Sequence, residues 1–206
     1  MRVVTFNIQH GRTPAGRVDL ALLGRVCAGF EADVLALQEV DVRRSRSGWV
    51  DTVARVRRAT GMHGVFGRAI RGYGNALFSR AALDDVAVVR LPRHGRNEPR
   101  ALLRATTSGL TFGVTHLSID EAEARAQLAA ALSCGLDVLA GDLNLRPDQL
   151  DGLVPDGEAT WPADNPRIRI DHVVALTDRV RATAAQVLPA PPLSDHRPLL
   201  AELWRT

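Results

Sequence analysis

Lysine is absent from this sequence of 206 residues, because all 26 of its basic side chains are arginine. The formal net charge is only +3, which is too small to indicate nucleic-acid binding by itself. An arginine-only composition is compatible with a GC-rich genome. It also suits phosphate ligands, since a guanidinium binds phosphate in a forked, bidentate way. Composition leaves both explanations open.

Cysteine is nearly absent as well. Cys27 and Cys134 both lie in apolar stretches typical of helices, which favours buried free thiols over a disulfide. There is no CxxC motif or Cys/His cluster, so the sequence does not indicate a zinc site.

Aromatic residues make up 4% of the chain, so stacking platforms for single-stranded nucleic acid are sparse. No apolar run approaches the roughly 18 residues of a membrane span. The N-terminus MRVVTFNI is typical of a strand and not of a secretory signal, and we expect a cytoplasmic protein. Length and a 46% hydrophobic fraction predict a single globular domain over residues 1–206, monomeric by default.

Short strand-like runs dominate the hydrophobic pattern. Strands are predicted at residues 1–8, 33–40 and 136–140, in several short runs between 64 and 117, and in the last forty residues. Helical spacing predicts helices from Val18 to Phe30, over 50–60, and from an Asp120 N-cap with Glu123 as its capping-box partner to Ser133. No repeat or linker divides the chain. The order of elements favours sheet packed on sheet with helices outside.

Polar side chains recur where predicted strands begin or end. They are Asn7 after RVVTF, Gln38 and Glu39 after DVLAL, Asn75 in NALFSR, His116 after TFGVT, Asp142 and Asn144 in GDLN, Asp171 and His172 after RIRI, and Asp195 and His196 before RPLLAEL. Each one alone is compatible with a capped turn or a satisfied surface residue.

The stretch LAGDLNLRP most clearly allows two interpretations, a simple turn or a pair of site residues. Gly, Asp and Asn are common turn formers, so a simple turn explains the stretch. Alternatively, Asp142 and Asn144, two apart on an extended chain, face the same side and present a carboxylate and a carboxamide together.

Carboxylates gathered in one place repel each other unless they share a cation. Oxygen ligands without thiolates indicate Mg²⁺, or Mn²⁺ in its place, rather than zinc. Two histidines beside such a site suggest general acid–base chemistry.

The segments TFNIQHG, LQEVD, GNALFSR, THL, GDLNLRP, RIDHV and SDHRP occur in this order between residues 3 and 200. Together they resemble the endonuclease/exonuclease/phosphatase family. GDLN and SDHRP carry most of the resemblance, whereas THL and GNALFSR are weak alone. The resemblance implies a four-layer α/β sandwich, two mixed β-sheets packed face to face with helices outside, and Mg²⁺-dependent hydrolysis of a phosphate ester.

The resemblance also implies roles for individual residues. Glu39 matches the metal-binding glutamate, and Asn7 and Asp195 would bind the metal directly or through water. Asp142 and Asn144 match the pair that positions the nucleophilic water and a phosphate oxygen. His196 matches the histidine that contacts the phosphate, Asp171 its orienting carboxylate, and His116 a second histidine that stabilises charge. Whether Asp142 or His196 takes the proton from water stays open.

The sequence indicates the residues that line the substrate groove less clearly. Asn75 is expected to support His116, and Asn75 and Arg100 are candidates for substrate binding. His10, Arg12, Trp161 and Arg167 are further candidates, each also compatible with a structural role. His172 is expected to be packed in the core, because alternation turns it away from the face of Asp171.

The shortness of the chain and the few insertions favour a small phosphodiester or phosphomonoester over duplex DNA. A non-specific nuclease that uses scattered arginines is the alternative. A different kind of function, that of a binding module without catalytic activity, is a further interpretation. The complete set of site residues argues against it.

Overall fold

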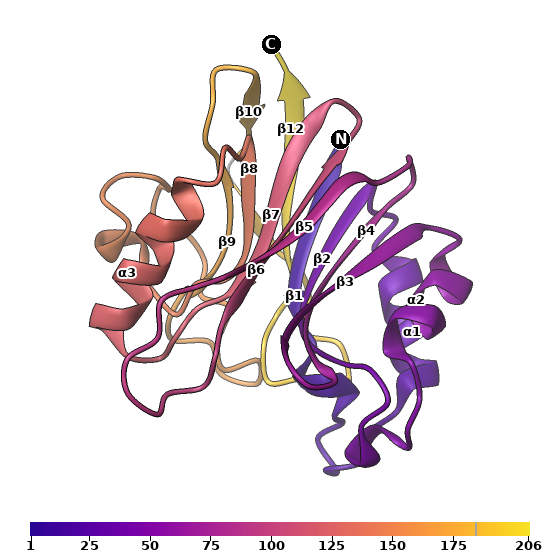
Figure 1. Cartoon of the computed structure of the whole chain (residues 1–206). Helices are drawn as coiled ribbons and strands as arrows, with labels where there is room; N and C mark the ends of the chain where they lie inside the picture. The colour runs from indigo at the N-terminus through magenta and orange to yellow at the C-terminus, as the bar shows by residue number, and fades with distance from the viewer. Residues whose placement is uncertain (184) are drawn as a thin grey trace.

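The strands form two sheets packed face to face in this computed structural model, which describes residues 1–183 and 185–206 (Figure 1). The seven-stranded sheet has the order β10-β12-β1-β2-β4-β3, with β11 also pairing β12. Its strands are β1 Arg2–Asn7, β2 Val34–Asp41, β3 His63–Ile70, β4 Tyr73–Ser79, β10 Val180–Ala182, β11 Gln186–Val187 and β12 Leu199–Arg205.

The second sheet has five strands in the order β5-β6-β7-β8-β9. They are β5 Asp84–Arg90, β6 Ala101–Thr107, β7 Leu110–His116, β8 Val138–Asp142 and β9 Asp171–Ala175. Both sheets are mixed, because β1 runs parallel to β2 and β7 runs parallel to β8 while the other pairings are antiparallel.

Helices cover the outer faces of the two sheets. Helices α1 (Leu20–Gly29) and α2 (Thr52–Thr60) lie on the seven-stranded side, and α3 (Glu121–Leu132) lies on the five-stranded side (Figure 1). Each begins at an aspartate, because Asp19, Asp51 and Asp120 accept a backbone N–H from the first turn. Three short 3₁₀ turns, η1 Gln9–Gly11, η2 Ser45–Ser47 and η3 Pro147–Gln149, complete the elements. None of the helices in the described residues has both the length and the apolar character that crossing a bilayer requires.

Three apolar layers separate the four layers of backbone. On β1, Val4 and Phe6 pack with α1 and α2, whereas Val3 packs between the sheets. On β8, Leu139 packs under α3 while Val138 faces the other sheet. This alternation buries both faces of the central strands, whereas the edge strand β5 is mostly exposed. The predicted four-layer α/β sandwich, with its three helices, is confirmed. Cys27 and Cys134 are free thiols, as predicted; Cys27 is buried as expected, whereas Cys134 is only partly buried.

Candidate active site

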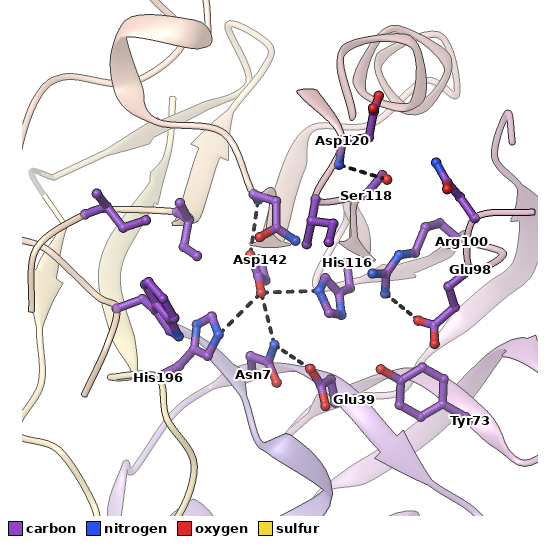
Figure 2. Close-up of a pocket in the computed structure, with 16 residues that line it drawn as sticks. Asn7, Glu39, Tyr73, Glu98, Arg100, His116, Ser118, Asp120, Asp142 and His196 are labelled. Carbon is purple, nitrogen blue, oxygen red and sulfur yellow. Dashed lines mark hydrogen bonds and ion pairs between the residues drawn. The ribbon is translucent and has the colours of Figure 1, made fainter. Parts of the chain in front are cut away.

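Several of the polar residues predicted at strand ends meet at one end of the sandwich, namely Asn7, Glu39, His116, Asp142, Asn144, Asp171 and His196. The parallel pairing of β1 with β2 places Asn7 beside Gln38, and that of β7 with β8 places His116 beside Asp142. Face-to-face packing then brings the two strand ends together. The Asn7 amide donates to the Asp142 carboxylate across the sheets at 3.0 Å (Figure 2).

Asp142 occupies the centre of this cluster and is 1% exposed. Its Oδ2 accepts from Asn7, and it lies 3.4 Å from His116 Nε2 and 3.6 Å from His196 Nε2 (Figure 2). Its Oδ1 accepts the backbone N–H of Asn144 at 3.1 Å. Burial and repulsion from Asp171 raise the pKa of Asp142, while His196 and Asn7 act in the opposite direction. A buried carboxylate with a raised pKa is a good proton acceptor.

Two backbone features place the GDLN stretch at the centre of this cluster. Gly141 approaches β7 so closely that a Cβ there would overlap the carbonyl oxygen of Thr115. Asn144 has a left-handed φ of +49°, and its side chain donates to the Leu117 carbonyl at 3.0 Å. Asp142 and Asn144 do line the same cleft, as alternation predicts. Strand β8 however includes Asp142, and the left-handed turn rather than an extended chain brings in Asn144.

His196 and Asp171 form a buried pair. His196 Nδ1 lies 2.9 Å from Asp171 Oδ2, and the side chain of Asp171 is fully buried. Burial alone would lower the pKa of His196, but Asp171, Asp142 and Asp195 outweigh it and raise this pKa to about 10. The imidazole is therefore held in a fixed orientation and carries a proton at neutral pH.

Glu39 is turned into the cleft by an irregularity in β2. The register between β2 and β4 shifts between Leu37 and Val40, and Glu39 has a φ of +57°. Its carboxylate accepts from the Asn7 amide at 3.2 Å and lies 3.9 Å from His10 Nδ1. Burial raises the pKa of Glu39, but His10, His116 and Asn7 together lower it to about 2. Glu39 is therefore ionised.

His116 stays neutral in this surrounding. Burial first and the nearby Arg100 second lower its pKa to about 3, against the opposing effect of Glu39. Arg100 lines the same cleft and pairs with Glu98 at 2.9 Å. His116 thus offers a neutral ring rather than a positive charge.

The cleft around these residues has a volume of about 920 Å³. Trp161, Ile168 and Ile170 line it on one side, while Tyr73, Glu98 and Ile119 are further lining residues that the strand-end pattern did not indicate. None of these last three stands at a predicted site position of a motif, so the sequence carries no signal for them.

Comparison with known families decides which family the chain belongs to. The sequence model described as "Endonuclease/Exonuclease/phosphatase family" matches residues 4–196. The chain belongs to the endonuclease/exonuclease/phosphatase family. Its members are metal-dependent phosphoesterases and nucleases, and they generally hydrolyse phosphate esters. Curated protein sequences gave no match to this chain.

Solved structures agree with the family on the fold. An endonuclease/exonuclease/phosphatase from Beutenbergia cavernae aligns with a TM-score of 0.83 and 25% identity, over 100% of this chain and 71% of its own. A family member from Bacteroides vulgatus has a TM-score of 0.69 and 18% identity, over 100% and 98%. TDP2 from Caenorhabditis elegans has a TM-score of 0.68 and 18% identity, over 100% and 74%.

The donors of the site fit the divalent metal on which the family depends. The carboxylates of Glu39 and Asp142 and the side chain of Asn7 line one cleft, and no thiolate lies among its lining residues. The Asn7 amide oxygen accepts the Gln9 N–H at 3.1 Å. In the described structure, Asp171 Oδ1 is buried without a hydrogen-bond partner. Ligand atoms of Asp142, Asp171 and His196 lie within 4.8 Å of one another. Such a concentration of oxygen donors suits a hard cation.

Asp195, the third predicted metal ligand, has different neighbours. Its carboxylate accepts the Trp161 indole N–H at 3.3 Å, and it lines an adjacent hollow rather than the cleft that Glu39 lines. Asp195 is thus placed near His196 and Trp161. Its predicted metal role stays a prediction.

Asn75 is not a cleft residue in this family member. It is 2% exposed, and its amide donates to the carbonyls of Ala101 at 2.9 Å and Val114 at 3.5 Å. Asn75 therefore links β4 to the other sheet instead of bonding the His116 ring. The expectation that Asn75 binds substrate gains no support from this position.

His172 is packed, as predicted. It is fully buried, and its Nε2 lies 2.8 Å from the Leu145 carbonyl.

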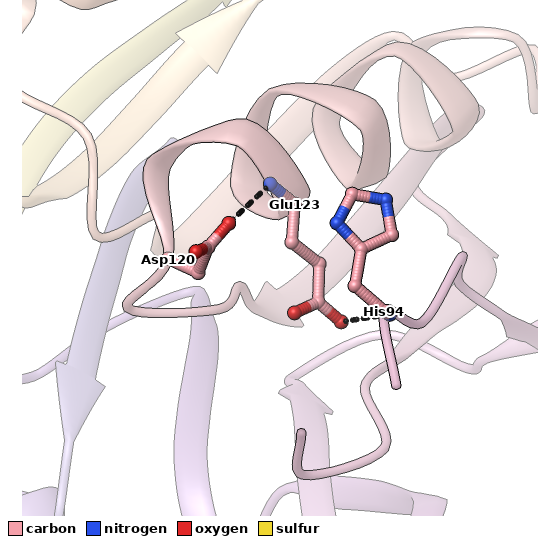
Figure 3. Close-up of side chains that lie close together, drawn as sticks. All are labelled: His94, Asp120 and Glu123. Atoms are coloured by element: carbon pink, nitrogen blue, oxygen red, sulfur yellow. Dashed lines mark hydrogen bonds between the residues drawn. The ribbon is translucent and has the colours of Figure 1, made fainter. Parts of the chain in front are cut away.

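The predicted capping box at α3 is half wrong. Asp120 accepts the Glu123 N–H at 2.8 Å, but the Glu123 side chain does not return to Asp120 (Figure 3). Glu123 instead accepts from the His94 N–H, Asn97, Ser118 and Gln127. The loop between β5 and β6 supplies two of these donors. His94, Asp120 and Glu123 form a second acidic group, whose most buried carboxylate is already satisfied.

Proposed function

We propose that this protein hydrolyses phosphodiesters with a bound divalent metal ion, Mg²⁺ or Mn²⁺. The observation that carries the proposal is the Asp142 carboxylate, buried where Asn7, His116 and His196 converge from both sheets. A structural carboxylate does not need two imidazoles and an amide facing one open cleft.

The residues around Asp142 bind and orient the phosphate. The His196 imidazolium, held by Asp171, presents Nε2 to the cleft beside Asp142 and attracts an anionic oxygen. His116 is neutral and donates or accepts one hydrogen bond. Asn144 fixes Asp142 through its backbone N–H and lines the cleft beside it.

Asp142 is the group we assign as proton acceptor from the attacking water. His196 already carries a proton, whereas burial and Asp171 raise the pKa of Asp142 toward the range of a general base. The sequence leaves open whether Asp142 or His196 accepts the proton, and these pKa shifts favour Asp142.

Glu39 and Asn7 are the residues that would hold the metal, with Asp195 as the remaining predicted ligand. When bound, the ion neutralises negative charge on the phosphate oxygens and the leaving oxygen. The low pKa of Glu39 keeps its carboxylate ionised for this purpose. The donor set gives no preference between Mg²⁺ and Mn²⁺.

The charge near Asp142 favours a diester over a monoester. Of the two cationic side chains that line the cleft, Arg100 is partly neutralised by Glu98, and His196 pairs with Asp171. A diester carries one negative charge, whereas a monoester dianion would need more compensation. The apolar side formed by Trp161, Ile168 and Ile170 suits an organic group on the ester.

Hydrolysis assays test this proposal. We expect turnover of bis-p-nitrophenyl phosphate with Mg²⁺ or Mn²⁺, weaker turnover of p-nitrophenyl phosphate, and none with EDTA. Plasmid DNA included in the assay distinguishes the non-specific nuclease. Glu39→Gln and His196→Gln should each lower kcat about a thousandfold or more.

His63→Gln is the matched control, because His63 is exposed at the start of β3 and outside the cleft. It should keep wild-type turnover. No hydrolysis of any substrate by folded wild-type protein would overturn the proposal and favour a binding module. Equal activity of wild type and Glu39→Gln would overturn the assignment of the site.

A further inference from the structure

A second hollow, of about 650 Å³, lies beside the active-site cleft, between η1, the N-terminus of α1, η2 and α2. Arginines from three segments of the chain reach it. Its charged lining residues are Arg12, Arg17, Arg46, Arg55 and, as the one carboxylate among its described lining residues, Asp19. His10 lines it as well. We call it the arginine hollow.

Its positive charge is not balanced inside the protein. Asp19, the N-cap of α1, accepts the Leu22 N–H at 2.8 Å, and its single negative charge offsets only one of the arginines. Arg46 is bound to Asp41 at 2.7 and 2.8 Å. Arg12, Arg17 and Arg55 form no ion pair with any described residue. These three cations, which come from two segments of the chain, surround one concavity and attract an anion, and guanidinium groups suit phosphate.

The arginine hollow adjoins the active site through His10. His10 lines the hollow, and its Nδ1 lies 3.9 Å from Glu39 Oε2 in the cleft. Gln9 and His10 both have left-handed φ values, +43° and +50°, which L residues adopt at a cost. The η1 turn thus places one imidazole between the two concavities. A ligand with anionic groups on both sides of the His10 ring would occupy the active-site cleft and the arginine hollow at the same time.

An exposed tryptophan stands next to the arginine hollow. Gly48 and Val50 line it, and Trp49 between them is 70% exposed with a φ of +62°. An exposed indole provides a face on which any nucleobase can stack. The low aromatic content of the chain excludes a row of such platforms but not a single one.

We propose that the arginine hollow binds a second phosphate of the substrate, next to the phosphate that is hydrolysed. This inference rests on the proposed phosphodiesterase function and narrows its substrate to molecules with two or more phosphates. Arg12, Arg17 and Arg55 supply the contacts, and Arg46 is held in place by Asp41. The phosphate belongs either to a nucleic-acid strand, which Trp49 favours, or to a small polyphosphorylated molecule.

Binding without turnover provides the first test. A fluorescein-labelled oligothymidylate of three nucleotides is titrated in EDTA and followed by fluorescence polarisation, with inorganic triphosphate as a competitor. The double variant Arg17→Gln/Arg55→Gln should weaken binding about tenfold or more and reduce the magnitude of the salt slope by about one. Arg58→Gln/Arg68→Gln is the control with the same charge change, because both arginines are exposed and lie outside the hollow.

Equal weakening in the two double variants, or none in the first, would overturn the inference. Trp49→Ala identifies the source of the phosphate. Weaker oligonucleotide binding with unchanged triphosphate competition supports a nucleic-acid strand, whereas unchanged binding of both supports a small polyphosphorylated ligand.

Kinetics distinguish a failed inference from a failed function. The ratio of kcat/KM for the oligonucleotide to that for bis-p-nitrophenyl phosphate should fall about tenfold in Arg17→Gln/Arg55→Gln relative to the control. If wild type hydrolyses bis-p-nitrophenyl phosphate and this ratio does not change, the second phosphate site is wrong and the phosphodiesterase stands. If wild type binds the oligonucleotide through these arginines but hydrolyses nothing, the phosphodiesterase function fails while the anion site stands.

Discussion

Asp142 shows how the protonation of one site residue depends on the charges of its neighbours. Its carboxylate lies close to that of Asp171, and Glu39 adds a third through the shared Asn7 amide. The His196 imidazolium is the close cation, since Arg100 is paired with Glu98. Negative charge therefore exceeds positive charge around Asp142. A divalent cation at Glu39 and Asn7 relieves this excess, which is the electrostatic reason to expect metal binding.

His172, which follows Asp171 in the chain but is packed in the core, provides a test of buried charge. Burial lowers its pKa from 6.5 to about 4, while the bond to the Leu145 carbonyl opposes this. The unfolded state thus binds a proton between these two pKa values that the folded state does not. The contribution of His172 to stability is complete above pH 6.5 and is lost as the pH falls toward 4. We expect about 2 kcal/mol of this loss to have occurred by pH 5.

Urea denaturation of wild type and His172→Gln at pH 8 and pH 5 measures this contribution. Glutamine keeps a donor for the Leu145 carbonyl but does not titrate. The variant should be less stable than wild type at pH 8, with a difference that narrows by about 2 kcal/mol at pH 5. A difference that is the same at both pH values would show that folding leaves the pKa of His172 unchanged.

At the scale of elements, irregular backbone decides where the site residues point. Strand β2 would place neighbouring side chains on alternate faces, but the register shift and the left-handed φ of Glu39 redirect that carboxylate into the cleft. The η1 turn, with two left-handed residues, does the same for His10. Each of these segments deviates from the regular period at a predicted or lining site residue.

Among the positions within strands and helices, Gly141 is the one where we expect a single substitution to disturb the site most. Any Cβ there meets the Thr115 carbonyl, so Gly141→Ala forces β8 away from β7. We expect a loss of about 3 kcal/mol, hence a Tm lower by about 6–12 °C, together with weaker divalent-metal binding because Asp142 follows directly.

Gly29→Ala is the control for this change. Gly29 is the last residue of α1, its φ is not left-handed, and no neighbouring atom lies within 4 Å of the point that a Cβ would occupy. The substitution should leave Tm unchanged or raise it slightly, since alanine favours helix. Differential scanning calorimetry of both variants compares them. A Gly141→Ala protein with wild-type Tm would show that β7 and β8 separate without cost.

Local sequence predicts the elements but not the contacts between distant loops. The helices and most strands follow from period and N-caps, and the site residues Asp142, Asp171 and His196 follow from the motifs. The Glu123 contacts were misjudged, and the Asn75 contacts were not foreseen, because their partners lie in segments that are distant in sequence and that only the fold brings near. Glu98 was missed because no motif marks it, and only the folded chain shows that it lines the cleft. The arginine hollow collects side chains from residues 10 to 55, a grouping that no local pattern reveals.

At the scale of the whole molecule, the proposed metal position lies where the two sheets meet. Asn7 and Glu39 come from the seven-stranded sheet, and Asp142 and His116 come from the five-stranded sheet. The Asn7–Asp142 bond joins them directly. A cation held by Glu39 and Asn7 next to Asp142 of the other sheet would bind the folded protein and not the unfolded chain, so it should stabilise the entire sandwich.

Thermal unfolding with and without divalent metal measures this stabilisation. At about one hundred times the dissociation constant, Mg²⁺ or Mn²⁺ should add about 2.7 kcal/mol and raise Tm by about 5–10 °C. Glu39→Gln should remove most of this increase, because the amide lacks the charge that attracts the cation, whereas His63→Gln should retain it. An increase of equal size in Glu39→Gln would place the metal elsewhere, and no increase in wild type at millimolar metal would argue against a resident ion between the sheets.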